Sequence, residues 1–135
     1  MSVRVQVEDF SLQQEYNEIL AEAGDAGAVV TFTGLVREFN QGEGIACVTS
    51  LTLEHYPGMT EKALGDIESQ AKQRWPLLAT RIVHRIGALT AHEQIVLVAA
   101  ASAHRHAAFE AAQFMMDYLK SRAPFWKKQE TNEGE

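Results

Sequence analysis

Hydrophobic residues recur along the chain either at every second position or at every third to fourth position, and these two patterns predict its strands and helices. Val3, Val5 and Val7 alternate with polar residues, which is typical of a short strand. An amphipathic helix is predicted next. Its apolar residues at helical spacing are Leu12, Tyr16, Ile19, Leu20 and Ala23. Residues 11–14 fit a capping box at the start of this helix, and Gly24 fits its end.

The middle of the chain predicts two long strands and a second helix. Residues 28–36 are rich in β-branched side chains and are expected to form a buried strand, and residues 46–56 a second one. Residues 38–44 between them are polar with two glycines, which predicts a loop. Pro57 and Gly58 break the second strand. The helix after them has an apolar stripe made of Met59, Ala63, Leu64, Ile67, Ala71 and Trp75.

The last part of the chain predicts two strands, the longest helix and a final extended segment. Residues 80–86 are strand-like, Gly87 begins a turn, and residues 94–101 form a strongly apolar strand. A helical pattern covers residues 102–122. Its apolar side carries Phe109, Ala112, Met116 and Leu119. Pro124 forces the helix to end, because the residue before a proline avoids the α region, and residues 125–128 are expected to be extended.

The predicted order of elements is β-α-β-β-α-β-β-α-β. Helices do not alternate one to one with strands in this order, so a doubly wound parallel sheet is disfavoured. We expect an α+β sandwich with a mostly antiparallel sheet and three helices. The length of 135 residues corresponds to one domain, so we expect a single domain over residues 1–135.

Composition narrows the class of protein further. Hydrophobic residues make up 46% of the chain and charged residues 22%, which is ordinary for a globular protein and argues against disorder. The uncharged runs are far shorter than the ~20 apolar residues that span a bilayer. The first residues lack the apolar core of a signal peptide. A cytoplasmic location is therefore the expectation.

The net charge of −6 hides an asymmetry between the two halves of the chain. Residues 1–70 hold twelve acidic and three basic residues, whereas residues 71–135 hold six acidic and nine basic residues. The overall acidity argues against nucleic-acid binding, because that function needs a basic face to release phosphate counterions. The basic half is instead suited to a small anion.

Common metal and nucleotide motifs are missing from the sequence. Gly42 and Gly44 lack the rest of a dinucleotide fingerprint, and no second histidine follows His92 at helical spacing. His104 and His106 are two residues apart on a predicted helix and do not face each other, so we expect no metal site. The single cysteine, Cys47, has no basic neighbour, which favours a buried structural thiol.

His104 and Arg105 follow an apolar strand at the predicted start of a helix. Free backbone N–H groups and the helix dipole make such a position suitable for an anion, and these two side chains would add donors. The alternative is that Ser102 simply caps the helix and both side chains are solvated. Spacing alone favours neither reading.

Basic residues also gather around the end of the longest helix. They are Lys120, Arg122, Lys127 and Lys128. Neighbouring cations disfavour each other's charge, so in a partly dry site Lys120 could act as a nucleophile or base. Phe125 and Trp126 within this run would give an aromatic wall, which suits a flat anionic ligand. The alternative is a solvated basic helix end. Arg37, at the end of a predicted strand, fits a site or an ordinary surface position equally well.

Five blocks of the sequence resemble the large, catalytic subunit of molybdopterin synthase. They occur in family order over roughly residues 27–130. The blocks include Val29, Thr31 to Gly34, Val36 and Arg37; Leu53 to Met59; His84 to Gly87; Ser102 to Arg105; and Met116 to Lys120 with Ala123 to Lys128. Five separate blocks in order make a specific signal.

The resemblance implies a sulfurtransferase of molybdenum cofactor biosynthesis with a hammerhead-type α/β fold. Such an enzyme converts cyclic pyranopterin monophosphate into molybdopterin by installing a dithiolene. The sulfur arrives as the C-terminal glycine thiocarboxylate of a small ubiquitin-like subunit, so no metal and no cofactor are expected. The family forms a central homodimer with one small subunit at each end, a heterotetramer.

The resemblance also assigns roles to particular residues. It makes Lys120 and Lys127 the catalytic lysines. The substrate-binding residues that it implies are Leu35, Val36, Arg37, His104, Arg105, Lys120, Lys127, Lys128 and Gln129. Among these we predict a phosphate-sized anion site formed by Arg37, His104 and Arg105. A second hypothesis is a non-catalytic dimeric module that binds a small anion. Lys120 discriminates between the two, because a binding module would accept arginine there whereas proton transfer requires lysine.

Overall fold

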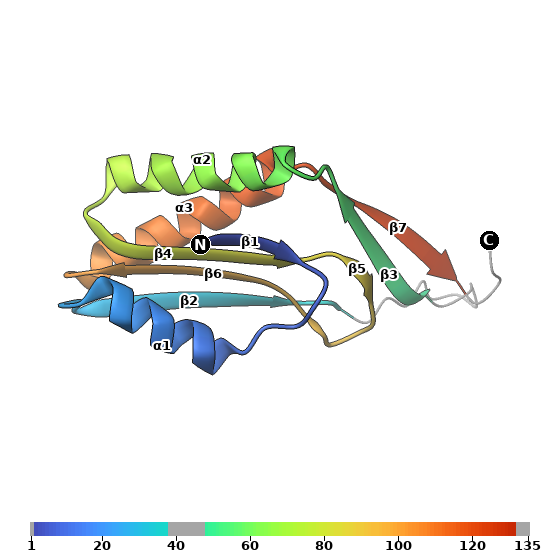
Figure 1. Cartoon of the computed structure of the whole chain (residues 1–135), viewed down its shortest axis with the longest axis horizontal. Coiled ribbons are helices and arrows are strands. Elements are labelled where there is room, and N and C mark those ends of the chain that lie inside the picture. Colours follow the sequence, from blue (N-terminus) through green and yellow to red (C-terminus); the bar gives the residue numbers. More distant parts are fainter. Residues whose placement is uncertain (1, 38–47, 132–135) are drawn as a thin grey trace.

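The computed structural model describes residues 2–37 and 48–131, and it has two sheets and three helices among them (Figure 1). The elements in chain order are β1 (Val3–Gln6), α1 (Leu12–Ala23), β2 (Ala28–Leu35), β3 (Val48–His55), α2 (Met59–Arg74), β4 (Leu77–Arg85), β5 (Gly87–Leu89), β6 (Gln94–Ser102), α3 (Arg105–Arg122) and β7 (Phe125–Thr131). The α+β class, the three helices and the mostly antiparallel pairing that the sequence predicts are confirmed.

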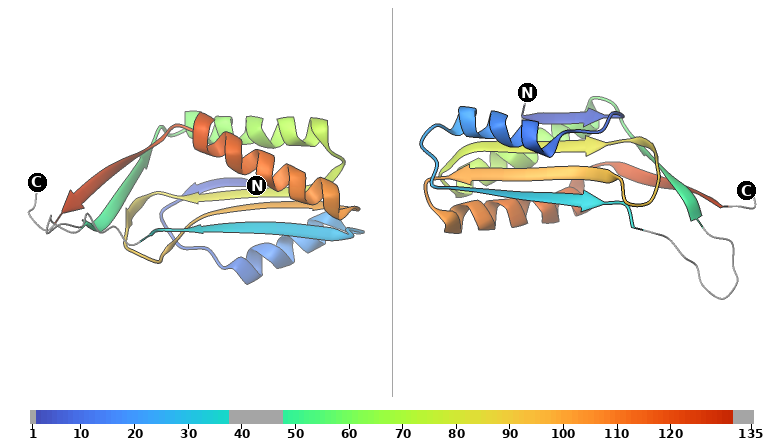
Figure 2. Two further views of the ribbon diagram at one scale, coloured as in Figure 1. Left: turned by 180° about the vertical axis from the view of Figure 1, so that it is seen from behind. Right: turned by 90° about the horizontal axis from the view of Figure 1, so that it is seen from below.

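The larger sheet has four strands in the order β1-β4-β6-β2. The β1–β4 pair is parallel, whereas β4–β6 and β6–β2 are antiparallel. Helices α2 and α3 cover one face of this sheet and α1 covers the other (Figures 1 and 2). Strand β2 is an edge of the sheet, and α3 packs over it and over β6.

The smaller sheet has three strands in the order β5-β3-β7 and extends beyond one end of the larger sheet (Figure 2). Both of its strand pairs are antiparallel. Strand β7 follows directly after α3, so the basic residues on either side of Pro124 fall on two different elements. This junction brings the end of α3 close to the smaller sheet.

The main core lies between the larger sheet and the helices α2 and α3. Leu64, Ile67 and Ala71 on α2 are at most 2% exposed, as the predicted apolar stripe requires. Ala111 and Met115 on α3 are fully buried against them. The apolar stripe of each helix therefore fixes which face meets the sheet and which face stays outside.

Helix α1 uses a different face from the one that its apolar residues predict. Its N-terminus is as expected, because the Ser11 hydroxyl accepts a hydrogen bond from the Gln14 N–H at 3.2 Å. Its buried residues, however, are Glu15, Ile19 and Ala23, while Leu12, Tyr16 and Leu20 are 38–41% exposed. The helix rotates because the carboxylate of Glu15 pairs with two arginines, Arg4 and Arg81, which hydrophobic spacing does not reveal.

Several predicted boundaries are corrected by the structure. Gly87 opens the short strand β5 rather than a simple turn, since its positive φ of 89° lets the chain bend directly into pairing with β3. Strand β2 is only partly buried, because it is an edge strand and leaves Phe32 41% exposed. Helix α3 begins at Arg105, since Ser102 still belongs to β6. The loop predicted at residues 38–44 and Cys47 lie outside the described residues.

Candidate functional site

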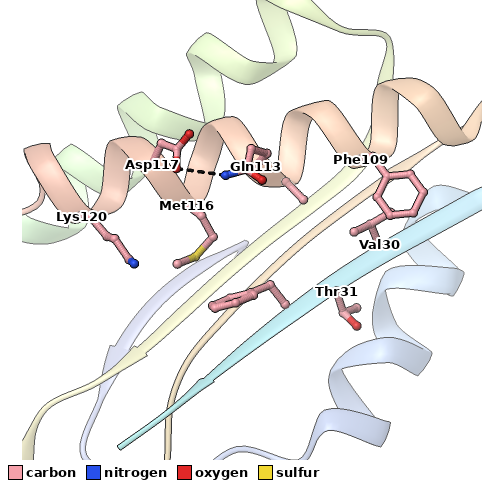
Figure 3. Close-up of a pocket in the computed structure, with 9 residues that line it drawn as sticks. Val30, Thr31, Phe109, Gln113, Met116, Asp117 and Lys120 are labelled. Atoms are coloured by element: carbon pink, nitrogen blue, oxygen red, sulfur yellow. Dashed lines mark hydrogen bonds between the residues drawn. The ribbon is translucent and has the colours of Figure 1, made fainter. Parts of the chain in front are cut away.

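A pocket of about 290 Å³ lies between helix α3 and the edge strand β2 (Figure 3). Strand β2 contributes Val30, Thr31 and Phe32, and α3 contributes Phe109, Ala112, Gln113, Met116, Asp117 and Lys120. The α3 residues at positions 109, 113, 116 and 120 follow helical spacing and so share one face. The pocket therefore has an apolar floor with polar groups toward the C-terminal end of α3.

Lys120 stands in the last turn of α3 with its side chain exposed at this pocket. The turn ends where Ala123 adopts an extended conformation before Pro124, with φ −80° and ψ 132°. A positive charge in the last helical turn interacts favourably with the helix dipole. Figure 3 shows the ammonium nitrogen directed toward the space between α3 and the strands.

Asp117 shares the pocket with Lys120 but is already engaged elsewhere. Its Oδ1 accepts a hydrogen bond from Gln113 Nε2 at 3.1 Å, drawn as a dashed line in Figure 3. In the part of the chain that the structure describes, Lys120 has no carboxylate within ion-pair distance. The ammonium group is therefore available to an anionic ligand.

Aromatic walls flank the pocket, although they are not the ones that the sequence suggests. Phe32 and Phe109 line it, with 41% and 61% of their surface exposed. Phe125 instead stacks on His84, with ring centroids 3.7 Å apart, and Trp126 packs against Tyr56 at 4.8 Å. The expectation that Phe125 and Trp126 form the wall beside Lys120 is corrected, because both rings are used at the junction with the smaller sheet.

His104 and Arg105 lie at the opposite end of α3 from Lys120. His104 is the N-cap residue and Arg105 the first residue of the helix, and both are exposed. Fifteen helical steps separate Arg105 from Lys120, which is about 22 Å at ~1.5 Å per residue. One chain therefore cannot bring both groups to one small substrate.

Arg37 is also distant from His104 and Arg105. In the β2–β6 pair, Ala28 lies opposite Ser102 and Leu35 lies opposite Gln94, so β2 begins beside the start of α3 and ends far from it. Seven strand steps at ~3.3 Å give about 23 Å. The predicted anion site of Arg37, His104 and Arg105 is therefore corrected: a single chain does not bring these three residues together.

The neighbours of Arg37 differ in their surroundings. Leu35, the last residue of β2, is 55% exposed. Val36 is 4% exposed and packs with Leu51, Leu53 and Leu89 under the smaller sheet. The side chain of Val36 is therefore part of the core, whereas Arg37 after it is exposed.

Strand β7 carries the remaining predicted residues. Lys127, Lys128 and Gln129 pair with Leu53, Thr52 and Leu51 of β3. Lys127 and Lys128 thus lie on the strand that follows the Lys120 helix. Their place beside Lys120 at the pocket mouth stays a prediction.

Metal-binding clusters and membrane-spanning helices are both absent from the part of the chain that the structure describes. Residues 2–37 and 48–131 contain no group of three or more His, Cys, Asp or Glu side chains that could hold a metal ion. Within the same ranges, no helix is both long and apolar enough to cross a lipid bilayer.

Sequence reasoning missed most of the pocket wall. Phe32, Phe109 and Met116 were expected only as strand or core residues, yet they line the pocket beside Lys120. A signal existed on α3, because Phe109, Met116 and Lys120 are spaced at seven and four residues and lie on one face. Nothing local indicated Phe32, since its role depends on β2 being a sheet edge next to α3.

The fold and the pocket define an α+β protein with a lysine at a ligand-sized pocket, and among the described residues this lysine has no carboxylate partner. The family model described as MoaE protein matches residues 5–122. A relative from Vibrio cholerae, a molybdopterin synthase catalytic subunit, is 59% identical over 131 residues, which cover 97% of this chain and 85% of the relative. The chain therefore belongs to the MoaE family, the catalytic subunits of molybdopterin synthase.

Solved structures agree with this family. Molybdopterin cofactor biosynthesis protein E from Burkholderia multivorans is 51% identical with a TM-score of 0.86, covering 95% of this chain and 86% of that one. A complex of subunits 1 and 2 of molybdopterin-converting factor from Helicobacter pylori is 18% identical with a TM-score of 0.81. It covers 98% of this chain and 86% of that one, and shows a shared fold.

Family membership decides between the two hypotheses drawn from the sequence. The chain is a catalytic subunit of the transferase class that acts in molybdenum cofactor biosynthesis. The resemblance seen in the five sequence blocks is thus confirmed, and the alternative of a non-catalytic binding module is not supported.

Proposed function

We propose that this chain transfers sulfur from the C-terminal thiocarboxylate of a small ubiquitin-like subunit to cyclic pyranopterin monophosphate. The observation that supports the proposal most strongly is the position of Lys120. Its ammonium group lies at the mouth of a pocket of about 290 Å³ and has no carboxylate partner among the described residues. A thiocarboxylate and a phosphate are both anions, so an available cation is what each requires.

Lys120 would act on the charge that moves during sulfur transfer. The thiocarboxylate sulfur bonds to a pterin carbon as an oxygen substituent leaves that carbon. Water then attacks the carbonyl carbon, so that its bond to sulfur breaks and the tail of the small subunit becomes a carboxylate. In both steps negative charge develops on the oxygen or sulfur that departs. A nearby ammonium stabilises that charge in a site shielded from water, and it can also donate or accept a proton. Lys127, on the strand that follows α3, is proposed as the second catalytic lysine.

The pocket walls fit the shape of a pterin. A fused flat ring system is favoured between apolar and aromatic faces, and Phe32 and Phe109 provide these faces together with Met116. The pocket volume is close to the lower end of the ~300–1,000 Å³ that is usual for small-molecule sites. These residues would hold the ring, while cations hold the phosphate.

Two copies of the chain are proposed to complete one site. The ~22 Å between Arg105 and Lys120 is too long for one substrate, so His104 and Arg105 would reach the pocket of a second copy. In a two-fold dimer, the start of α3 in one copy can lie beside the end of α3 in the other. Arg37 would bind the substrate from the end of β2, together with Leu35 and the backbone of Val36. Lys128 and Gln129 would bind it from β7.

The proposed assembly is a homodimer with one small subunit at each end, a heterotetramer. The Helicobacter pylori protein is described as a complex of two subunits, which supports a small partner here. A flexible glycine tail on that partner could enter the pocket at Lys120. We further propose that the chain acts as one domain and in the cytoplasm.

The proposed function is tested by reconstitution. The chain is mixed with a thiocarboxylated small subunit and cyclic pyranopterin monophosphate, and the dithiolene product is measured. The unmodified chain should form product, and Lys120→Ala should reduce turnover on the order of 10²-fold or more, as expected for the loss of a stabilising charge.

Lys72→Ala is the matched control for this experiment. Lys72 is also an exposed lysine in the last turn of a helix, but on α2 and outside the pocket. It should keep parent turnover. Equal activity of Lys120→Ala and the parent chain would remove the basis of the proposal, as would the absence of product with the unmodified chain.

A further inference from the structure

The chain is held by two backbone hydrogen bonds as it leaves β2. The Val36 N–H donates to the Glu93 carbonyl at 2.9 Å, and the His92 N–H donates to the Val36 carbonyl at 2.6 Å. Residues 92 and 93 therefore clasp the backbone next to Arg37 by bonding both the N–H and the carbonyl of Val36. They belong to the turn of residues 90–93 between β5 and β6, and neither the sequence blocks nor the proposed mechanism gives this turn a role.

This turn is held in shape by the carboxylate of Glu93. Its Oε2 accepts hydrogen bonds from the Thr90 N–H at 2.9 Å and the Thr90 hydroxyl at 2.7 Å. Its Oε1 accepts a hydrogen bond from Arg85 Nη1 at 3.0 Å. These bonds, those from Thr90 first, lower the pKa of Glu93 to about 2, so the carboxylate is charged at any working pH.

Arg85 fixes the carboxylate to the larger sheet. It is 7% exposed, near the end of β4. Its Nε donates to the Val7 carbonyl at 3.1 Å, and its Nη1 also donates to the Gln94 carbonyl at 3.0 Å. The guanidinium thus ties two segments, at Val7 and at residues 93–94, to strand β4. A planar fork of donors does this better than an ammonium group.

The turn also contains a backbone conformation that needs support. His92 has a positive φ of 77°, which is uncommon for a residue other than glycine. Such a conformation persists where surrounding contacts over-determine it, and it often lies beside functional groups. In this turn the contacts are those of Thr90, Arg85 and Val36.

We propose that Arg85 and Glu93 are positioning residues for substrate binding, because they hold the turn that clasps Val36 and thereby set the place of Arg37. This inference rests on the proposed role of Arg37. Arg85 and Glu93 do not touch the substrate; they act through the backbone at Val36. Loss of either group should therefore weaken substrate binding only as long as Arg37 is present.

Equilibrium binding of cyclic pyranopterin monophosphate to the chain tests this coupling. Arg37→Ala, Glu93→Gln and the double variant are compared. Glu93→Gln alone should raise the dissociation constant several-fold to roughly tenfold, as misplacement of a binding group does. In the Arg37→Ala background it should add nothing, because residues that act through one another are not additive.

Arg81→Lys serves as the matched control. Arg81 is a buried arginine on the same strand, paired with acidic residues of α1 and remote from the 90–93 turn. It should lower the melting temperature without changing the dissociation constant. The proposal would be overturned if Arg81→Lys weakened substrate binding as much as Glu93→Gln at the same loss of melting temperature. It would also be overturned if the effects of Glu93→Gln and Arg37→Ala on the dissociation constant were additive.

Hydrogen exchange of the Val36 amide gives a readout independent of the substrate. Glu93→Gln should accelerate this exchange roughly tenfold, because the bond to the Glu93 carbonyl opens more often. Unchanged exchange would overturn the positioning role. A different outcome is that Glu93→Gln accelerates the exchange but Arg37→Ala leaves the dissociation constant unchanged. In that case the turn does hold Val36, but Arg37 does not bind the substrate. The inference is then overturned because the proposed role of Arg37 is wrong.

Discussion

Arg105 is the first residue of α3 and Lys120 stands in its last turn, so one helix carries two cations of the predicted site at its opposite ends. Their separation of about 22 Å exceeds the length of a pterin monophosphate. Both residues belong to sequence blocks that resemble one family, and both are exposed. Their separation is the physical reason to expect a site that two copies share.

A dimer is expected even without the small partner. Two large apolar side chains that line the pocket are exposed, Phe32 at 41% and Phe109 at 61%, and Leu35 at the end of β2 is 55% exposed. Exposed apolar side chains of this size favour an interface. Light scattering at micromolar concentration should give twice the chain mass. A monomer mass under these conditions would contradict the shared site.

Complementation between two defective variants should restore product formation at a pterin concentration well below the raised KM of Arg105→Ala, where that variant alone forms little product. Arg105→Ala alone should raise the KM for the pterin with the fold intact, and Lys120→Ala alone should lose turnover. If the chains exchange at random, about half of the dimers are mixed and each mixed dimer has one intact site, so about a quarter of the parent activity should return.

The measurement is product formation after mixing equal amounts of the two variants under subunit exchange. The double variant Arg105→Ala/Lys120→Ala mixed with Lys120→Ala is the control and should stay inactive, because neither chain supplies an intact lysine. Activity that stays at the level of the separate variants would show that each chain uses its own residues.

His84 should make the stability of the protein depend on pH. It is 6% exposed and stacks on Phe125, and burial lowers its pKa from 6.5 to about 4. Between these values the unfolded chain binds a proton that the folded chain does not. Stability is thus complete above pH 6.5 and falls as the pH drops toward 4, by roughly 2–3 kcal/mol at pH 4.5.

Urea unfolding at pH 7 and pH 4.5 measures this effect. His84→Phe keeps an aromatic ring against Phe125 and removes the titrating group, so the fall in unfolding free energy should shrink by that amount. His106→Gln is the control for the loss of a histidine outside the core, because the His106 side chain is 82% exposed. If the unfolding free energy of His84→Phe fell as much between pH 7 and pH 4.5 as that of the parent chain, groups other than His84 would cause the loss of stability in acid.

Much of the fold could be predicted from the sequence, because the spacing of its hydrophobic residues indicates which face of a helix or strand is buried. The stripe on α2 and the breaks at Pro57 and Pro124 place their elements within a few residues. The rotation of α1 could not be predicted, since it depends on Glu15 meeting Arg4 and Arg81 from distant parts of the chain. Strand β5 was missed because three residues carry no recognisable period.

The candidate site could be predicted as a set of residue types but not as a geometry. Local chemistry singled out Lys120 and Arg105, and the family resemblance assigned both to the site. Nothing local could reveal their separation or the role of Phe32, because these depend on how α3 lies over the edge strand β2. The clasp at Val36 could not be predicted from the sequence either, since it joins residues more than fifty positions apart.

The central claim is that Lys120 does more than hold an anion, and Lys120→Arg tests it most directly. Arginine keeps the positive charge at the pocket, but it cannot give up a proton at working pH. Single-turnover product formation is measured with the thiocarboxylated small subunit, after binding of that subunit has been checked separately. We predict that Lys120→Arg binds the small subunit and loses most turnover; turnover near the parent rate would contradict the claim and leave Lys120 as an anchor only.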